Sequence, residues 1–409
     1  MEIKMKIKDI QVFVSCPGRN FVTVKVTTED GVYGVGDATV NGREMAVVAY
    51  LNEHVIPCLV GRDAHDIEDI WQYLYRGVYW RRGPITMAAV AAIDMALWDI
   101  KGKVAGLPLY QLLGGKSRTG VTVYAHANGE TVEDTLDKVG ECIDQGFKVV
   151  RLQCAVPGLK ETYGVLGDKK DYFELQGNRP LPPEQTWSTS KYFNMVTDLF
   201  EKARERFGYE VEFTHDVHSR LTPIESARLG KMLEKYNLLF LEDASIAENQ
   251  ENYKLIRQHT TIPLALGETY NTIWDCKDLL QNQLIDYIRV AATHAGGITA
   301  MKRIADFASV YNVKTAPHGA PDLSPVCFVA HMHLNISTPN FGIQEYVGMG
   351  NDETKRIFKH EMRLENGMVY VSDKPGLGIE FDEEAAKEFP YKRSYLPVSR
   401  LEDGTLWHW

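Results

Sequence analysis

The segments Phe-Thr-His-Asp-Val-His (213–218), Leu-Leu-Phe-Leu-Glu-Asp (238–243) and Pro-Leu-Ala-Leu-Gly-Glu (263–268) each run from strand-forming residues into an acid. The acids stand at equal intervals along the chain. Between them lie polar–apolar patterns of helical length, the first opened by the capping box Thr-Pro-Ile-Glu (222–225). Repeated strand, acid and helix predict parallel βα units of a barrel, in which the carboxyl ends of the strands build the active site.

The three acids, Asp216, Glu242 and Glu268, are candidate metal ligands. A single acid after a strand is more often a loop residue or a helix cap. Three acids at equal spacing, each at the end of a predicted strand, are difficult to explain as loop residues or helix caps. Oxygen ligands that converge from neighbouring strands suit a hard cation, so the sequence predicts a Mg²⁺ site.

The composition limits the classes of function. The chain has 409 residues and a net charge of −10, which argues against binding to nucleic acid or to an anionic membrane surface. No apolar run approaches the length of a membrane span, and the first residues lack the apolar core of a signal peptide. The six cysteines are scattered without a Cys-x-x-Cys pair. We therefore expect reduced thiols and a cytoplasmic protein.

The rest of the chain extends the barrel pattern in both directions. Residues 5–14, 21–28 and 32–38 read as strands, and 84–106 as an apolar helix, so an α+β module precedes the barrel. A polar, Gly- and Pro-rich stretch after residue 153 reads as an active-site lid. The pattern predicts eight barrel strands, at 121–125, 149–153, 211–215, 238–241, 264–267, 287–290, 313–316 and 341–344.

Together with the three acids, two adjoining motifs resemble the enolase superfamily. They are Ala-Ile-Asp-Met-Ala-Leu-Trp-Asp-Ile-Lys-Gly-Lys (92–103) and Gly-Leu-Pro-Leu-Tyr-Gln-Leu-Leu-Gly-Gly (106–115). The resemblance is greatest to the mannonate dehydratase subgroup, which includes starvation-sensing-type homologues. Its features appear here at 16–20, 79–84, 151–154, 216–218, 247–250, 293–297, 318–322 and 401–407.

The resemblance implies an α/β fold, a (β/α)7β-type TIM barrel with an N-terminal α+β capping domain. We expect the capping domain at 1–117, the barrel at 118–368, and a C-terminal segment, 369–409, that returns to the capping domain. It also implies a Mg²⁺-dependent hydro-lyase whose partner is a small acid sugar. A homo-oligomer is expected from the family and from the aromatic-rich region at 70–82.

The base departs from the pattern common in the wider superfamily. Where a Lys-x-Lys pair often ends the second barrel strand, this chain has Val-Val-Arg-Leu-Gln (149–153). Arginine stays charged and accepts protons poorly. Resemblance to the subgroup supplies Tyr163 as the base, with Arg151 lowering the pKa of its phenol.

The acid and the substrate contacts follow in part from position and in part from the resemblance. His218 lies two residues beyond Asp216 and is the leading acid for loss of the β-hydroxyl, with His318 as the second candidate. Arg289 ends a strand and is expected to face the pocket, or else to form a structural salt bridge. The expected substrate-binding residues are Asn41, His126, His218, Glu268, Arg289, His318, Asp322, Glu345 and Trp407.

Two readings of the function stay open at the level of sequence. The first is dehydration of D-mannonate, or of D-gluconate, to 2-keto-3-deoxy-D-gluconate through an enediolate. The second is a diverged relative with low or no activity that binds or senses an acid sugar. Ala244, where related sequences often have proline, and Tyr270, which places an aromatic residue near the metal acids, keep the second reading open. A racemase or lactonising enzyme is disfavoured by the missing Lys-x-Lys pair.

Overall fold

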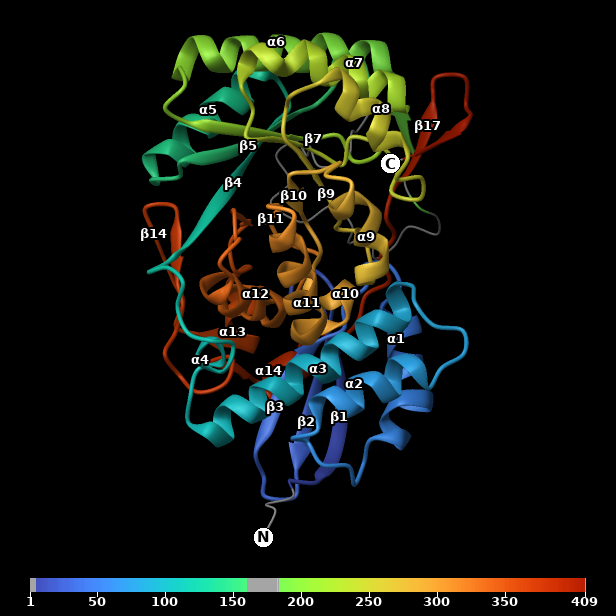
Figure 1. Ribbon diagram of the computed structural model, residues 1–409, viewed down its shortest axis with the longest axis vertical. Coiled ribbons are helices and arrows are strands. Elements are labelled where there is room, and N and C mark those ends of the chain that lie inside the picture. Colours follow the sequence, from blue (N-terminus) through green and yellow to red (C-terminus); the bar gives the residue numbers. More distant parts are fainter. Residues whose placement is uncertain (1–4, 160–181, 183, 409) are drawn as a thin grey trace.

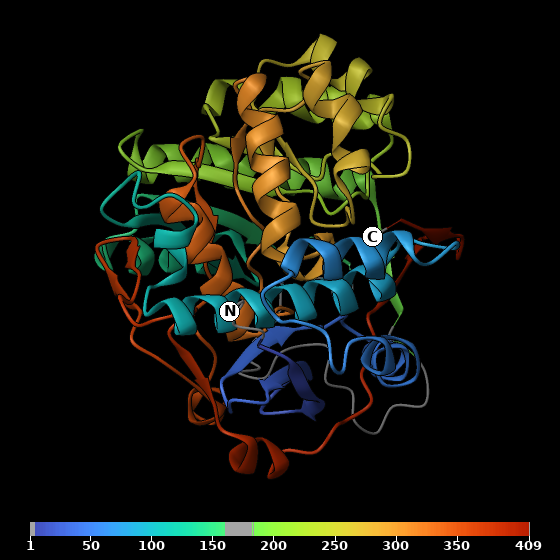
Figure 2. The ribbon, with the colours of Figure 1, turned by 60° about the horizontal axis from the view of Figure 1, so that its bottom comes forward.

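The computed structural model describes residues 5–159, 182 and 184–408. The chain forms an N-terminal α+β unit at one end of the molecule, a barrel beyond it, and a tail that contacts both (Figure 1). The long helix α3 (Pro84–Ala105) crosses between the N-terminal strands and the barrel helices (Figure 2). Among the described residues, no helix combines the length and apolar character needed to cross a membrane.

The N-terminal unit is a three-stranded antiparallel sheet covered by helices. Its strands are β1 (Ile7–Ser15), β2 (Phe21–Thr28) and β3 (Tyr33–Asp37), and its other helices are α1 (Glu44–Tyr50) and α2 (Ile67–Arg76). Gly34 and Gly36 let β3 approach α3 closely, because a Cβ on Gly36 would lie 1.9 Å from the carbonyl oxygen of Ala92. The strands predicted near the N-terminus are confirmed.

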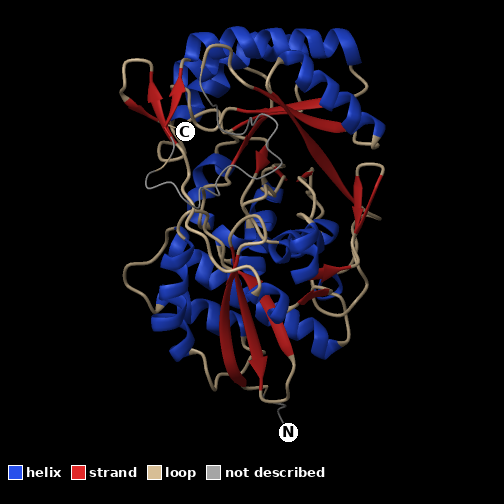
Figure 3. Cartoon of the chain, turned by 180° about the vertical axis from the view of Figure 1, so that it is seen from behind, coloured by secondary structure: helices blue, strands red, loops and turns tan. Residues whose placement is uncertain are grey.

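Eight parallel strands form the barrel, and their order around it follows the chain. Figure 3 distinguishes the strands of the molecule from its helices. Strand β12 pairs with β4, and a bridge from Phe341 to Thr315 joins the last two strands, so the barrel closes. The strands are β4 (Val121–Gly129), β5 (Val149–Cys154), β7 (Glu212–Asp216), β8 (Phe240–Glu242), β9 (Leu264–Leu266), β10 (Tyr287–Ile288), β11 (Lys314–Thr315) and β12 (Gln344–Glu345).

Helices follow seven of these strands, which confirms the predicted (β/α)7β-type barrel. Thr222 and Glu225 form the predicted capping box at the start of α7. The short α4 (Leu109–Leu112) links the two units. The barrel helices are α5 (Val132–Asp144), α6 (Thr189–Phe207), α7 (Pro223–Leu233), α8 (Asn252–His259), α9 (Ile273–Gln281), α10 (Ala292–Ala295), α11 (Gly297–Val310) and α12 (Pro325–Ser337).

The tail passes over both units. It contains α13 (Asp352–Ile357), β13 (Phe358–His360), β14 (Arg363–Glu365), β15 (Met368–Tyr370), β16 (Ile379–Phe381), α14 (Glu383–Lys387), β17 (Val398–Leu401) and β18 (Leu406–Trp407). Strand β15 pairs with β4 of the barrel, and Pro390 bridges to Ser15 of the N-terminal unit. The last segment then leaves that unit, because β17 pairs in parallel with β6 (Glu184–Trp187) beside the barrel. The domain division expected from the sequence stays a prediction.

Candidate active site

The three acids singled out in the sequence come from consecutive barrel strands. Asp216 ends β7 and Glu242 ends β8, and the two residues are paired in register. Both are buried, whereas the side chain of Glu268, just beyond β9, is 19% exposed. The parallel strands therefore bring the acids to one end of the barrel.

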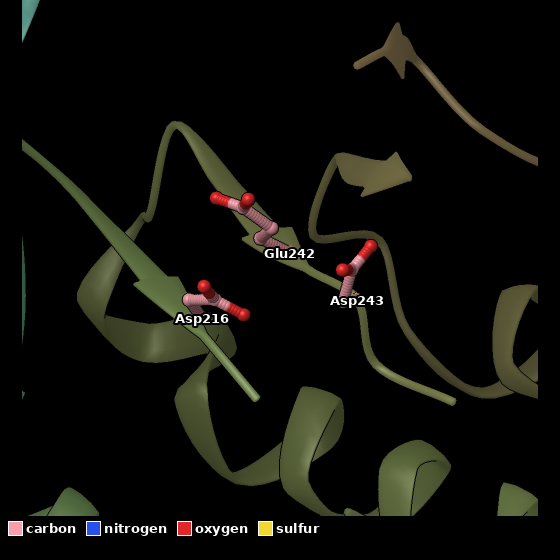
Figure 4. A group of neighbouring side chains, drawn as sticks. All are labelled: Asp216, Glu242 and Asp243. Atoms are coloured by element: carbon pink, nitrogen blue, oxygen red, sulfur yellow. The ribbon is translucent and has the colours of Figure 1, made fainter. Parts of the chain in front are cut away.

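The structure groups Asp243, which the sequence did not single out, with Asp216 and Glu242, and Glu268 lies outside this closest group of described residues. One carboxylate oxygen from each of Asp216, Glu242 and Asp243 lies within 4.8 Å of the others. Figure 4 shows these three side chains on neighbouring strand ends. Adjacent side chains on a strand normally point to opposite faces. The positive φ of Asp243, 41°, breaks the extended backbone directly after Glu242.

The positive charge near the group is concentrated on Asp216, which Arg151 contacts, and on one oxygen of Glu242, which Arg289 contacts. Burial raises the pKa of Glu242, and Asp216, Glu345 and Glu268 raise it further against the effect of Arg289. Burial and the charges of Glu268 and Asp216 likewise raise the pKa of Asp243. Glu242 Oε2 and Asp243 Oδ1 are buried and have no hydrogen-bond partner among the described residues. An all-oxygen set of crowded carboxylates fits a hard divalent cation such as Mg²⁺.

His318 lies next to Glu268, in the loop between β11 and α12. Its Nδ1 is 3.0 Å from Glu268 Oε2 and 3.1 Å from Glu345 Oε2, and its Nε2 is 3.0 Å from Asp322 Oδ1. Burial opposes charge on the ring, but the three carboxylates outweigh it and hold the pKa of His318 well above its usual value. His318 therefore lines the cavity with both ring nitrogens directed at carboxylates.

Arg151 and His126 form a second network, on β5 and β4. Arg151 donates from Nη1 to Asp216 Oδ2 (3.0 Å) and from Nη2 to His126 Nδ1 (3.0 Å). Because Nδ1 of His126 accepts this bond, its Nε2 carries the proton and lies 2.9 Å from Glu345 Oε1. Burial and the charge of Arg151 lower the pKa of His126 to about 4, so the ring is neutral.

His218 lies near the acids, as expected, but because of a turn after β7 and not because it continues the strand. Strand β7 ends at Asp216, and His218 has a positive φ of 52°, so the ring turns back toward the strand end. Its Nε2 lies 2.9 Å from Asp216 Oδ2. Gln153 donates from Nε2 to His218 Nδ1 (3.3 Å) and to the carbonyl of Asp216 (3.4 Å). Since Nδ1 accepts, the proton of a neutral His218 lies on Nε2, and Gln153 is a contact that the sequence did not suggest.

Arg289 was expected either to face the pocket or to form a structural salt bridge, and in the structure it forms ion pairs with two buried glutamates. The side chain is fully buried and does not line the cavity among the described residues. Its Nε lies 2.6 Å from Glu242 Oε1, its Nη2 2.8 Å from Glu345 Oε2, and its Nη1 donates to the carbonyl of Ala316. Arg289 therefore fills the alternative role, an ion pair inside the barrel mouth.

A cavity of about 800 Å³ lies beside this site; of the three acids predicted as metal ligands, Glu268 is among its described lining residues and Asp216 and Glu242 are not. Among its lining residues are eight that the sequence analysis named, Asn41, His126, Arg151, His218, Glu268, His318, Asp322 and Glu345. Leu396 of the tail also lines the cavity and was not foreseen. Trp407 is not part of this wall; its Nε1 donates to the carbonyl of Arg220 instead (2.7 Å). Tyr163 lies outside the described residues.

Comparison with known proteins identifies the family. Residues 136–385 match the family model described as enolase C-terminal domain-like. Residues 8–114 match the mandelate racemase / muconate lactonizing enzyme N-terminal domain. The chain belongs to the enolase superfamily. The two matches cover an N-terminal and a barrel part of this enolase superfamily chain in the order expected from its sequence.

Full-length relatives lie within the superfamily. The chain is 59% identical over 404 residues to a D-mannonate dehydratase of Sphingomonas sp. (strain SKA58), covering 99% of this chain and 100% of the relative. It is 58% identical, with the same coverage, to a protein of Chromohalobacter salexigens named D-galactonate dehydratase family member ManD. A crystal structure of an enolase from Pantoea ananatis with bound D-gluconate and Mg is 38% identical, with a TM-score of 0.90 over 99% of this chain and 100% of that one.

Proposed function

We propose that this protein is a Mg²⁺-dependent acid-sugar dehydratase that converts D-mannonate to 2-keto-3-deoxy-D-gluconate, with D-gluconate as the next substrate to test. The observation that carries the proposal is the buried carboxylate group at the strand ends, in which Asp216 contacts the cavity-lining residues Arg151 and His218. The full-length identity of 59% to a D-mannonate dehydratase supports the choice of substrate.

Asp216, Glu242 and Glu268 would hold the metal ion, with Asp243 beside them. A divalent cation bound there supplies positive charge for the substrate carboxylate while its charge increases on loss of the C2 proton. The side chains around it supply the remaining positive charge. Arg151 is fixed against Asp216, and His318 is fixed between Glu268, Glu345 and Asp322.

The base in this proposal is Tyr163. Its phenolate takes the proton from C2, and the electron pair left behind expels the hydroxyl from C3. Arg151 lines the cavity and keeps its charge, because Asp216 and Glu345 outweigh the effect of burial and raise the pKa of its guanidinium. A fixed positive charge near a phenol favours the phenolate form, which is the form that accepts a proton.

The acid in this proposal is His218. A proton from its ring accompanies the C3 hydroxyl, which leaves as water, and the enol that remains becomes the 2-keto product. Gln153 and Asp216 hold the ring at both nitrogens, so it is oriented before the substrate arrives. His318 and Asp322, with Asn41 across the cavity, are proposed to bind substrate hydroxyl groups.

A second candidate is a diverged relative that binds an acid sugar with little or no turnover. The naming of its relatives favours keeping this candidate, because a protein 58% identical to this chain is described only as a family member. Tyr270, one of the two departures noted in the sequence, is buried and lies outside the cavity lining among the described residues. Its effect on the substrate therefore has to pass through neighbouring residues.

We further propose a homo-oligomer in the cytoplasm. Tyr79 and Trp80 are each 87% exposed, with their rings packed edge to face, and such an aromatic pair is typical of a protein–protein contact. The six cysteines are free in the structure, which suits a reducing compartment. Light scattering of the purified protein measures the oligomeric state directly.

The deciding experiment is a screen of the Mg²⁺-loaded protein against aldonic and uronic acids, with 2-keto-3-deoxy product as the readout. Formation of 2-keto-3-deoxy-D-gluconate from D-mannonate supports the proposal. Absence of product across the panel, together with calorimetric binding of an acid sugar, overturns it in favour of the binding protein.

A further inference from the structure

The N-terminal unit buries several aspartates against the barrel and tail, and one of them bonds to a segment that lines the cavity. Asp37, the last residue of β3, is fully buried. Asp94 of α3 accepts from the backbone N–H of Thr299, and Asp99 accepts from that of Leu377, so both hold the units together away from the cavity. Asp37 instead bonds to Thr39 and Ser324, each of which lies two residues from a residue that lines the cavity.

All four acceptor positions of the Asp37 carboxylate are filled. Its Oδ1 accepts from the backbone N–H of Thr39 (3.0 Å) and from Thr39 Oγ1 (2.6 Å). Its Oδ2 accepts from the backbone N–H of Ser324 (3.0 Å) and from Thr293 Oγ1 (3.0 Å). The first pair of donors belongs to the N-terminal unit and the second pair to the barrel, so one carboxylate joins the two.

The barrel side of this junction is the loop that carries His318 and Asp322. The loop is fixed at its start, where the N–H of His318 donates to the carbonyl of Arg289 (3.1 Å) and the N–H of Gly319 donates to Glu345 Oε2 (2.9 Å). Ser324, the N-cap residue of α12, fixes its end through Asp37. Asp322 lies two residues before Ser324, the residue that fixes the end of the loop.

The other side of the junction is the segment that carries Asn41. Thr39, which donates twice to Asp37, also accepts from the backbone N–H of Val22 on β2 (3.0 Å), so the segment is tied to the sheet. Asn41 follows two residues later and lines the cavity, as His318 and Asp322 do from the barrel. The cavity thus has two walls, the Asn41 segment and the His318–Asp322 loop, that are joined through the Asp37 carboxylate.

We propose that Asp37 is a positioning residue that fixes the spacing between these two walls, and hence between Asn41 and the His318–Asp322 pair. Asparagine in its place has an amide nitrogen where an oxygen now accepts two bonds. One pair of donors would then face another donor, whichever way the amide turns. Either the loop or the Asn41 segment must move away.

The test compares Asp37→Asn with Asp94→Asn, which changes a buried carboxylate at the same interface but bonds to α11 and not to the loop. Hydrogen–deuterium exchange of residues 38–42 and 318–324 is measured in both, together with kcat, KM and Mg²⁺ affinity. We expect faster exchange in both segments only in Asp37→Asn. We also expect kcat to fall on the order of 10²-fold, the effect of a misplacement of about 1 Å, with unchanged Mg²⁺ affinity.

The kinetic part rests on the proposed function, and the exchange part does not. If the wild-type protein forms no product, the proposed function fails, and the exchange data still decide the role of Asp37. Should Asp37→Asn not fold, Thr293→Val removes one donor and leaves the carboxylate, with faster exchange of 318–324 expected. Unchanged exchange in the variant that folds, or an equal loss of kcat in Asp94→Asn, overturns the proposal.

Discussion

Arg151 illustrates how the environment of a single residue decides its role. Its guanidinium is buried between Asp216, Glu345 and His126, and it cannot give up its proton. The proposed mechanism therefore needs another group as the base, and the sequence offers Tyr163 at the start of the stretch that follows β5. The role of Tyr163 is testable without any change to the metal ligands.

We expect Tyr163→Phe to lose product formation by at least about 10²-fold, because the substitution removes the phenol oxygen that takes the C2 proton. Magnesium affinity, measured by calorimetry, should not change. Tyr172→Phe, in the same stretch of sequence, is the matched control and should keep wild-type turnover. Wild-type turnover in Tyr163→Phe would exclude this tyrosine as the base.

The sequence predicted the acids whose position follows from the order of the parallel strands. It missed Asp243, whose position depends on a local break in the extended backbone. Asp216 and Glu242 end neighbouring parallel strands, and that position alone places them together. Asp243 joins them only because its φ is positive, which no alternation pattern shows. Whether Arg289 points into the cavity or into the barrel depends on how the strands are staggered, and this is a property of the closed sheet.

At the scale of the element, the contact between β3 and α3 depends on two glycines. An alanine at position 36 would place its Cβ 1.9 Å from the carbonyl oxygen of Ala92, within the helix backbone. We expect Gly36→Ala to destabilise the protein by at least about 3 kcal/mol, as overpacking and lost contacts do. Urea unfolding followed by circular dichroism measures this difference.

A glycine-to-alanine substitution should raise the free energy of unfolding, and not lower it, where the added methyl group has room. Gly140 lies within α5, and a Cβ built on it meets no atom within 4 Å. Gly140→Ala should therefore stabilise the protein by about 0.5–1 kcal/mol through helix propensity. Equal effects of the two substitutions would contradict the close packing of β3 on α3.

Helix α3 also makes stability depend on pH through Asp94. Burial raises the pKa of Asp94 to about 7, against hydrogen bonds from Thr299. The folded state then holds its proton more tightly than the unfolded state, where the pKa is near 3.8. This contribution favours folding at low pH and is lost as pH rises toward 7.

We therefore expect the free energy of unfolding of the wild-type protein to fall by up to about 3 kcal/mol more than that of Asp94→Asn between pH 5 and pH 8. The asparagine keeps an acceptor for the N–H of Thr299 and has no charge to bury. Denaturant unfolding at the two pH values gives the difference. Parallel pH dependence of the two proteins would show that Asp94 does not titrate in this range.

Strands were predicted well where a short stretch of sequence determines them, and poorly where their pairing depends on a distant segment. The buried runs at 149–153 and 264–267 became β5 and β9 because apolar runs between turn signals have few alternatives in a βα repeat. The pairing of β17 with β6 joins segments far apart in the chain. Neither segment has a pattern that names its partner, so only the folded structure shows the pair.

At the scale of the whole molecule, the buried acids predict that metal binding and folding are coupled. A Mg²⁺ ion at a hundred times its Kd should stabilise the folded state by about 2.7 kcal/mol. We expect Tm to rise with added Mg²⁺ and to return to its original value with a chelator. Differential scanning fluorimetry follows both changes.

Glu242→Gln should abolish that rise in Tm, because the substitution removes a charged oxygen from the centre of the acidic group. Glu201→Gln on α6 is the matched control, since the side chain of Glu201 is 54% exposed and its ion pair with Lys235 lies at the surface. It should respond to Mg²⁺ as the wild type does. A full Mg²⁺ response in Glu242→Gln would remove Glu242 from the ligand set.

The parallel pair of β6 and β17 has a consequence for how the protein is made. A ribosome delivers the chain from its N-terminus, and domains fold in that order as they emerge. Strand β6 emerges before most of the barrel, whereas β17 is among the last segments to be synthesised. The edge of β6 therefore waits without its partner through most of translation. This small sheet is completed only once the nascent chain is nearly finished.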